Sequence, residues 1–325
     1  GGGGGGGAPP PAGAPGGMGL AELAQAVELE RLPAELLREA GRGALRPEVA
    51  AAWVRLARTP GLEMLCRRSR FLRQRLLADP RFLFKALFQV GVGAAGSCAQ
   101  EARRWRAGGP RAGASAGWAA EAPFFAVDLV VGAALDFALV ALLAPVAALG
   151  VSAGAPAAAA VAATSSGGGA AAGLRAFCDG LPRGVCERAA AGAPGYTVGQ
   201  RASSLVLRSA ELAVVGSLLG VLGQLAANSA LVTRKKLDEG HAEGFSAPNP
   251  GAAGASWGGL AVLASLRFQA IVGAERVVEQ RLGGAPALSL ASTVLLRGGD
   301  NLVWEQGLLG GLLGGGRGDG GSQDY

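Results

Sequence analysis

The segment DLVVGAALDFALVALLAP at residues 128–145 has the composition of a lipid-spanning helix, except that it contains Asp128 and Asp136. The run from Phe124 to Pro145 would form a helix about 33 Å long, close to the ~30 Å hydrocarbon core of a bilayer. Its Leu, Val and Phe side chains favour insertion by about 4 to 7 kcal/mol, whereas an Asp near the centre costs about 2.5 to 3.5 kcal/mol. The helix is therefore predicted to enter a membrane only with help from partner helices.

The two aspartates are eight positions apart, which is about 80° around a helix and about 12 Å along it, so both can face one bundle interior. Acids inside a membrane commonly line a substrate or ion path, or pair with a buried base. Three arginines lie beside or within later apolar runs and are candidate bases: Arg208, Arg267 and Arg297. A path for a cation and a structural ion pair are both open interpretations of Asp128 and Asp136.

Three further apolar segments follow, at 212–232, 257–281 and 285–307. The first has small residues that allow another helix to approach closely, and they are predicted to pack helices: Gly216, Gly220 and Gly223. The third is interrupted by RGGDN at 297–301, which indicates either a broken helix lining a site or a helix end followed by a tail. Polar groups in such segments need partners, and the predicted substrate or ion path comprises Asp128, Asp136, Gln224, Asn228, Arg267 and Gln269.

Residues 86–100 form a shorter uncharged run, below the ~20 residues that a spanning helix needs. They could cross if Lys85 reaches the interface, or form a re-entrant or in-plane helix. The clusters RRWRAGGPR (103–111) and RKK (234–236) fall on one membrane face if two consecutive helices cross between them. The basic N-terminal region joins that face only if 86–100 does not cross, so the positive-inside rule favours the in-plane alternative.

The N-terminal region, residues 18–85, carries 13 basic and 8 acidic residues, a net charge of 13 − 8 = +5. Such a surface suits anionic lipid or nucleic acid. The basic stretch 67–75 contains one aromatic residue, Phe71, which argues against nucleic acid. One apolar stripe in 62–80 predicts a single amphipathic helix, either at a membrane surface or packed on a neighbour: Leu62, Leu65, Ser69, Leu72 and Leu76.

The chain has 56 Gly and 17 Pro among 325 residues, concentrated in a few low-complexity stretches. We predict a disordered tail at 1–17, a helical basic region at 18–80, a membrane domain at 81–307 with a low-complexity connector near 150–175, and a disordered tail at 308–325. The predicted fold is all-α, a polytopic membrane helix bundle of about four spanning or re-entrant helices with basic amphipathic helices before it.

The sequence contains no GxSxG, HExxH or Walker pattern, and His241 is its one histidine. The four cysteines form no CxxC pair, so reduced thiols are expected, with a Cys178–Cys186 disulfide as a minor alternative. We therefore expect no enzyme activity, no metal site and no cofactor.

Several motifs occur in an order that resembles the RETICULATA and RETICULATA-related proteins of plant and algal plastids. They are FLRQRLLADPRFLFK (71–85), VDLVVGAALDFALVALLAP (127–145), LPRGVCE (181–187), PGYTVGQR (194–201), GQLAANS (223–229) and LRFQAIVGAERVVE (266–279). The similarity runs from about residue 62 to about 307. The Gly/Ala insertions near 150–173 and the LLRGGDN stretch depart from the family pattern, so the resemblance assigns no role to Arg297 or Asn301.

The resemblance implies a multi-pass protein of the plastid envelope, the inner membrane above all, that is imported by a transit peptide. It also implies support of plastid metabolism and leaf development by moving a small metabolite, for which a basic amino acid is our hypothesis. The alternative is a non-transporting membrane scaffold or assembly factor. Expected partners are the lipid bilayer and a small cationic metabolite, with a homo-oligomer as an open alternative and no nucleic acid.

Overall fold

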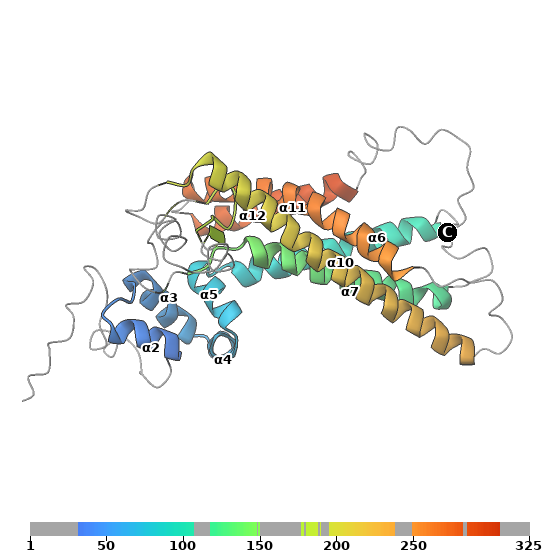
Figure 1. The fold of residues 1–325 in the computed structure, drawn as a ribbon, viewed down its shortest axis with the longest axis horizontal. Helices are drawn as coiled ribbons and strands as arrows, with labels where there is room; N and C mark the ends of the chain where they lie inside the picture. The colour runs from blue at the N-terminus through green and yellow to red at the C-terminus, as the bar shows by residue number, and fades with distance from the viewer. Residues whose placement is uncertain are drawn as a thin grey trace, which may run out of the picture. The chain divides into compact units, whose positions relative to one another are not determined.

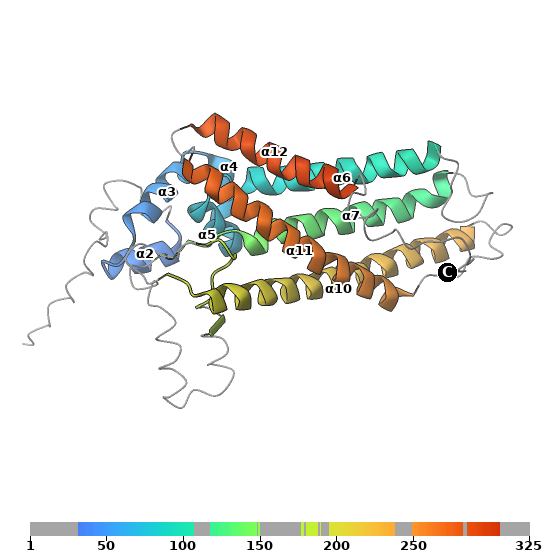
Figure 2. The same cartoon turned by 90° about the horizontal axis from the view of Figure 1, so that it is seen from above.

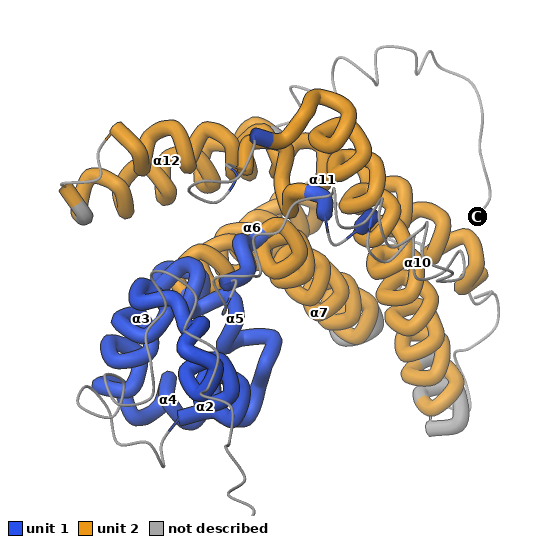
Figure 3. The backbone as a smooth tube through the Cα atoms, turned by 60° about the vertical axis from the view of Figure 1, so that its left-hand side comes forward, with its two compact units in different colours: residues 1–83, 144–181, 189–195 blue, residues 84–143, 182–188, 196–325 orange. Residues whose placement is uncertain are grey.

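The computed structural model describes residues 32–106, 118–147, 149, 177–178, 180–187, 189, 195–237, 249–281 and 285–305. These residues form nine helices and no β-strand (Figure 1), which confirms the all-α prediction. The predicted tails, the low-complexity connector near 150–175 and His241 lie outside the described residues. The chain divides into two compact units, shown in Figure 3.

The first unit contains α2 (Ala34–Gly41), α3 (Pro47–Ala57), α4 (Pro60–Arg68) and α5 (Arg70–Ala78). Its core is formed by fully buried apolar side chains that include Leu36, Leu45, Trp53 and Leu76. The turn between α2 and α3 depends on Gly43, whose φ of 63° lies in the left-handed region that favours glycine. This unit is thus a small helical cluster around an apolar core.

The single amphipathic helix predicted over 62–80 is wrong, because the chain bends at Ser69. Ser69 has extended backbone, and its hydroxyl accepts a hydrogen bond from the Leu72 amide, so it caps the start of α5. Arg73 and Arg75 are buried, and Arg73 forms an ion pair with Glu35 of α2 at 2.8 Å. Residues with helical spacing in 62–80 therefore belong to two helices, α4 and α5, with a boundary at Ser69.

Burial is also reflected in the titration of Cys66, which lies at the end of α4. Burial raises the pKa of the Cys66 thiol, and the nearby Arg73 guanidinium opposes that rise. All four cysteines are free, so the Cys178–Cys186 disulfide alternative is wrong.

The second unit contains α6 (Phe82–Arg106), α7 (Trp118–Leu143), α10 (Val198–Leu237), α11 (Pro250–Arg281) and α12 (Pro286–Glu305), with only the first two residues of α6 assigned to the other unit. Figure 2 shows α11 running diagonally between α10 and α12. In the described part of the chain, four helices are long and apolar enough to cross a membrane: α6, α7 from Ala122, α10 as far as Ala230, and α11.

Two helices differ from the sequence analysis. Residues 86–100 belong to a continuous helix of 25 residues, which is longer than its uncharged core indicated, so α6 has the length to cross. The predicted interruption at 297–301 is also wrong, because α12 is helical through Gly298 and Gly299 to Glu305.

The second unit has the polarity expected of a bundle in lipid. Large apolar side chains of α10 and α11 are exposed, including Val214, Leu218, Leu222, Leu263 and Leu266. The buried face of α11 instead carries small and polar residues, among them Gly254, Gly258, Ala261, Ser265 and Gln269. Lipid tails are as apolar as leucine, so membrane helices associate through close packing and polar contacts.

The glycines of α10 lie at its contacts with two neighbours. A Cβ at Gly216 would lie 2.7 Å from the Trp257 carbonyl oxygen of α11, and one at Gly220 would lie 2.8 Å from the Ala253 carbonyl oxygen. A Cβ at Gly223 would lie 2.6 Å from Val131 of α7. The α10 backbone therefore approaches α11 and α7 at distances that only glycine permits.

We expect Gly220→Ala to lower the free energy of unfolding by about 1 to 3 kcal/mol, because the added methyl group meets the α11 backbone. Gly259→Ala in α11 is the matched control, since nothing lies within 4 Å of a Cβ there. Thermal unfolding of both purified variants in detergent measures the difference. Equal stability of the two variants would contradict this account of the α10–α11 contact.

Candidate functional site

A buried ion pair in the second unit joins Arg297 of α12 to Glu275 of α11. Their side chains are 2% and 3% exposed, and the Arg297 Nε and Nη2 atoms lie 2.6 and 2.9 Å from the two carboxylate oxygens. The guanidinium carbon also lies 4.8 Å from the centre of the Phe268 ring. Two parallel charge-assisted hydrogen bonds give this pair a fixed geometry.

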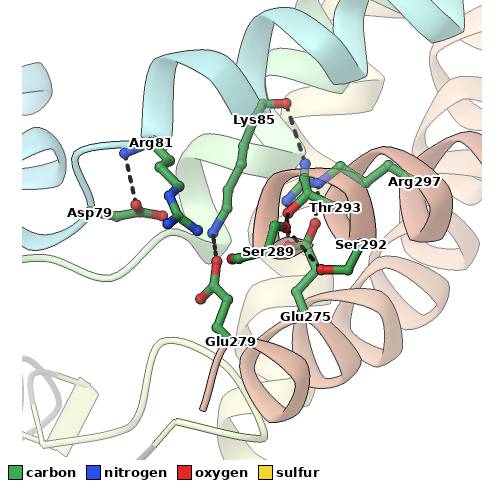
Figure 4. A network of polar contacts seen from close by, with 9 residues as sticks. All are labelled: Asp79, Arg81, Lys85, Glu275, Glu279, Ser289, Ser292, Thr293 and Arg297. Carbon is green, nitrogen blue, oxygen red and sulfur yellow. Dashed lines mark hydrogen bonds and ion pairs between the residues drawn. The ribbon is translucent and has the colours of Figure 1, made fainter. Parts of the chain in front are cut away.

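A second ion pair extends this network to α6, as Figure 4 shows. Lys85 Nζ lies 2.8 Å from Glu279 Oε1, one turn beyond Glu275 on α11. Arg297 Nη1 also donates to the Lys85 carbonyl oxygen at 3.4 Å. Lys85 thus contacts α11 through its side chain and α12 through its backbone.

Asp136, a predicted path residue, lies against α6 in the same unit. The Gln89 side-chain amide donates to Asp136 Oδ1 at 3.4 Å, and Gln89 is 0% exposed. A Cβ at Gly93 would overlap Asp136 Oδ2, so the carboxylate occupies space that this glycine leaves open. The Gln89 Oε1 atom is buried and has no hydrogen-bond partner. Asp128 lies on the same helix as Asp136, eight residues earlier, and is partly buried.

The other predicted path residues are distributed over α10 and α11. Arg267 lies 3.1 Å from Asp300 of α12, and Gln269 donates to the Ser265 hydroxyl of its own helix at 3.4 Å. Gln224 donates to Asn228 at 2.9 Å within α10. Each of these two glutamine bonds lies within a single helix, α10 for Gln224 and α11 for Gln269, so neither bond joins two helices.

The three candidate bases contact acids that the sequence analysis did not assign to them. Arg297 pairs with Glu275, Arg267 with Asp300, and Arg208 with Glu211. Glu275 and Glu279 were missed because both stand near the end of an apolar run, where acids are ordinarily solvated. Their spacing of four residues on α11 was the available signal, since it places them on one face.

The loop at 182–187, part of the LPRGVCE motif, lies on the start of α10 and on α11. Ser204 donates to the Pro182 carbonyl oxygen at 2.6 Å, and Arg201 donates to the Val185 carbonyl oxygen. Cys186 Sγ would lie 2.7 Å from a Cβ at Gly273. The motifs LPRGVCE (181–187) and PGYTVGQR (194–201), which are separated in the sequence, therefore contact each other in the structure.

Tyr196, just before α10, is the titratable group that this loop perturbs. Burial raises the pKa of its hydroxyl, the nearby Glu187 carboxylate raises it further, and Arg201 opposes both effects. A tyrosine hydroxyl is protonated at physiological pH even at its ordinary pKa, so this rise leaves Tyr196 neutral there.

Residues 74–274 match the RETICULATA-like family, described as "Protein RETICULATA-related". The chain belongs to the RETICULATA-like family. Among the described residues of this family member, no group of three or more His, Cys, Asp or Glu side chains is arranged to hold a metal ion.

Three curated relatives of this RETICULATA-like chain come from Arabidopsis thaliana. Protein RETICULATA-RELATED 1, chloroplastic, is 31% identical over 244 residues, which cover 74% of this chain and 51% of the relative. Protein RETICULATA, chloroplastic, is 29% identical over 278 residues, covering 83% and 58%. Protein RETICULATA-RELATED 4, chloroplastic, is 28% identical over 259 residues, covering 79% and 59%.

The matched part of this chain spans between 51% and 59% of the length of those relatives. No solved structure matches it. The family prediction made from the motifs is confirmed.

We expect Gly93→Ala to destabilise the protein by about 1 to 3 kcal/mol, because its methyl group displaces the Asp136 carboxylate. The same change in an Asp136→Ala background should cost much less, since the displaced group is gone. Gly91→Ala is the matched control on α6, where a Cβ meets nothing within 4 Å. Thermal unfolding in detergent measures all four variants, and an unchanged cost of Gly93→Ala without the carboxylate would contradict the proposed contact.

Proposed function

We propose that this protein resides in the plastid envelope, in the inner membrane, as a multi-pass protein that moves a small cationic metabolite such as a basic amino acid. A plastid role is supported by the family and by its relatives that are named chloroplastic. The four apolar helices fit a membrane protein. The observation that carries the transport proposal is the pairing of Asp136 with the buried Gln89 inside the bundle.

The Gln89–Asp136 pair has the chemistry that a cation requires. Asp136 supplies a carboxylate, and Gln89 supplies an amide oxygen that is buried without a hydrogen-bond partner. An unsatisfied buried acceptor costs about 1 to 3 kcal/mol, which a bound donor would recover. Ammonium and guanidinium groups carry several donors and no acceptor, so they match both groups. An anionic substrate would be repelled by Asp136.

The cation would meet this pair in a region of low dielectric constant, where a carboxylate attracts it strongly. Passage also requires that the interaction be reversible. Gln89 supports this, because a neutral amide oxygen contributes a ligand without adding a second negative charge. The proposal therefore assigns Asp136 the electrostatic role and Gln89 the orienting role.

A non-transporting scaffold or assembly factor is the second candidate function. It is favoured by the buried pair Arg297–Glu275 and the partly buried pair Lys85–Glu279, in which each charge already has an opposite partner. Such pairs fix the register of helices and require no ligand. A scaffold would co-purify with other envelope proteins and show no stabilisation by metabolites.

Transport is tested by the uptake of labelled arginine, lysine and ornithine into liposomes that contain the purified protein. We expect saturable uptake, which Asp136→Asn reduces to the level of empty liposomes because the carboxylate charge is lost. Ser229→Ala is the control, since Ser229 is exposed and its hydroxyl bonds to the Leu225 carbonyl oxygen of its own helix.

Both variants must match the unchanged protein in thermal unfolding, so that loss of uptake reports on transport alone. Absence of uptake for these amino acids and for a wider metabolite panel, with all proteins folded, would contradict the transport proposal. The scaffold would then be the better account, with Asp136 in a structural role.

A further inference from the structure

The helix α12 has an inverted distribution of polar and apolar residues. Its buried side chains recur every four residues and are all polar: Ser289, Thr293, Arg297 and Asn301. Its exposed residues, where side chains are described, are all apolar or glycine: Ala287, Leu288, Ala291, Val294, Leu295, Gly299, Leu302 and Val303. Leu295 is 73% exposed. A helix on a water-soluble protein turns its apolar stripe inward, which is the opposite arrangement.

Three described residues that lower the mean hydropathy of α12 have side chains that are covered by neighbouring helices: Arg297, Asp300 and Asn301. Arg297 is paired with Glu275, and Asp300, whose side chain is 7% exposed, lies 3.1 Å from Arg267. Asn301 is also buried. An average over the sequence counts these polar groups as if they faced the surroundings. The exposed surface of α12 is far more apolar than its composition.

We propose that α12 is a fifth membrane-embedded helix whose exposed face contacts the acyl chains of lipids. At 20 residues it is about 30 Å long, which matches the hydrocarbon core. Its neighbour α11 has the same polarity, with Leu263 and Leu266 exposed and Ser265 and Gln269 buried, and is long and apolar enough to cross. Exposed apolar side chains thus occur on two helices that contact each other. The proposal does not depend on transport.

The proposal has a physical requirement, which the described charged side chains of α12 meet. Charged groups in a membrane-embedded helix must face the bundle and be paired, because an unpaired charge in hydrocarbon is costly. Arg297 and Asp300 each contact an opposite charge on α11. Acyl chains are the occupant that fits the exposed face, since it offers no described charged group for a protein partner or water to contact.

The test places a nitroxide spin label on α12 in the full chain, reconstituted in liposomes, with the four native cysteines replaced by alanine. Labels at Leu288→Cys, Leu295→Cys and Leu302→Cys are compared by their collision rates with oxygen and with a polar nickel chelate. Leu218→Cys, exposed on α10, is the lipid reference, and Glu48→Cys, exposed on α3, is the aqueous reference.

We expect the ratio of oxygen to nickel collisions at Leu295→Cys to match Leu218→Cys and to exceed Glu48→Cys by about tenfold, because the chelate enters hydrocarbon poorly. Leu288→Cys and Leu302→Cys, closer to the helix ends, should give intermediate ratios. Nickel access at Leu295→Cys equal to that at Glu48→Cys would overturn the proposal. Low collision rates with both reagents would also overturn it, since protein, such as a second copy, would then cover the face.

A second measurement keeps the cysteines in place. Liposomes containing a phosphatidylcholine with a photoreactive acyl chain are irradiated, and the modified peptides are identified by mass spectrometry. Modification of the α12 peptide that ends at Arg297, at a level comparable with the modification of α10 peptides, supports the proposal. Absence of acyl-chain adducts on α12 while α10 is modified would overturn it.

Discussion

The arrangement of the second unit depends on the ion pair between Arg297 and Glu275. Neither charge has access to solvent, so each is stable only while the other is in place. The pair fixes the position of α12 along α11, and the bond from Arg297 to the Lys85 carbonyl oxygen brings in α6. The Phe268 ring, against the guanidinium, adds a cation–π contact. One side chain thereby sets the register of three helices.

Other contacts bring small and polar residues together between helices, while several large apolar side chains of α10 and α11 face outward. Gly216 and Gly220 let the α10 backbone approach α11, and Gly93 leaves space for Asp136 between α6 and α7. Each of these glycines gives a neighbour room that a side chain would take. The result is an interior in which small residues, amides and charges lie beside large apolar side chains such as Leu139, Leu212 and Phe268. In such an interior a carboxylate such as Asp136 can be kept for function as well as for packing. The first unit, with Trp53 and Leu76 inside, has the ordinary polarity of a soluble protein.

Local patterns in the sequence predicted much of this fold, and long-range pairings account for what they missed. The apolar runs of α7, α10 and α11 were recognisable because their length and composition are typical of membrane-spanning helices. The length of α6 was underestimated because the helix continues through charged residues on both sides of the uncharged run at 86–100. The break at Ser69 was missed since the apolar stripe continues across it with helical spacing. The extended backbone of Ser69 separates α4 from α5, and its hydroxyl caps the start of α5.

In the candidate site, too, local patterns predicted single residues but not their long-range partners. Asp136 was predicted from its position in an apolar helix, but its partner Gln89 is 47 residues away. Lys85 and Glu279 are 194 residues apart, and no local pattern joins them. The RGGDN stretch was interpreted as a break because glycines weaken helices. In the structure the buried Arg297 within that stretch pairs with Glu275 on α11, and the helix continues through it.

The central claim, that a paired buried charge holds the bundle together, is tested most directly by a double-mutant cycle. The free energy of unfolding would be measured for Arg297→Met, Glu275→Leu and the combined variant, with the exposed Arg42→Met as a control. Each single change should destabilise the protein by about 3 to 5 kcal/mol, because it leaves an uncompensated buried charge, and the combined change should cost less than either. The control should change stability by less than about 1 kcal/mol. Single changes as mild as the control, or costs that simply add, would contradict the account.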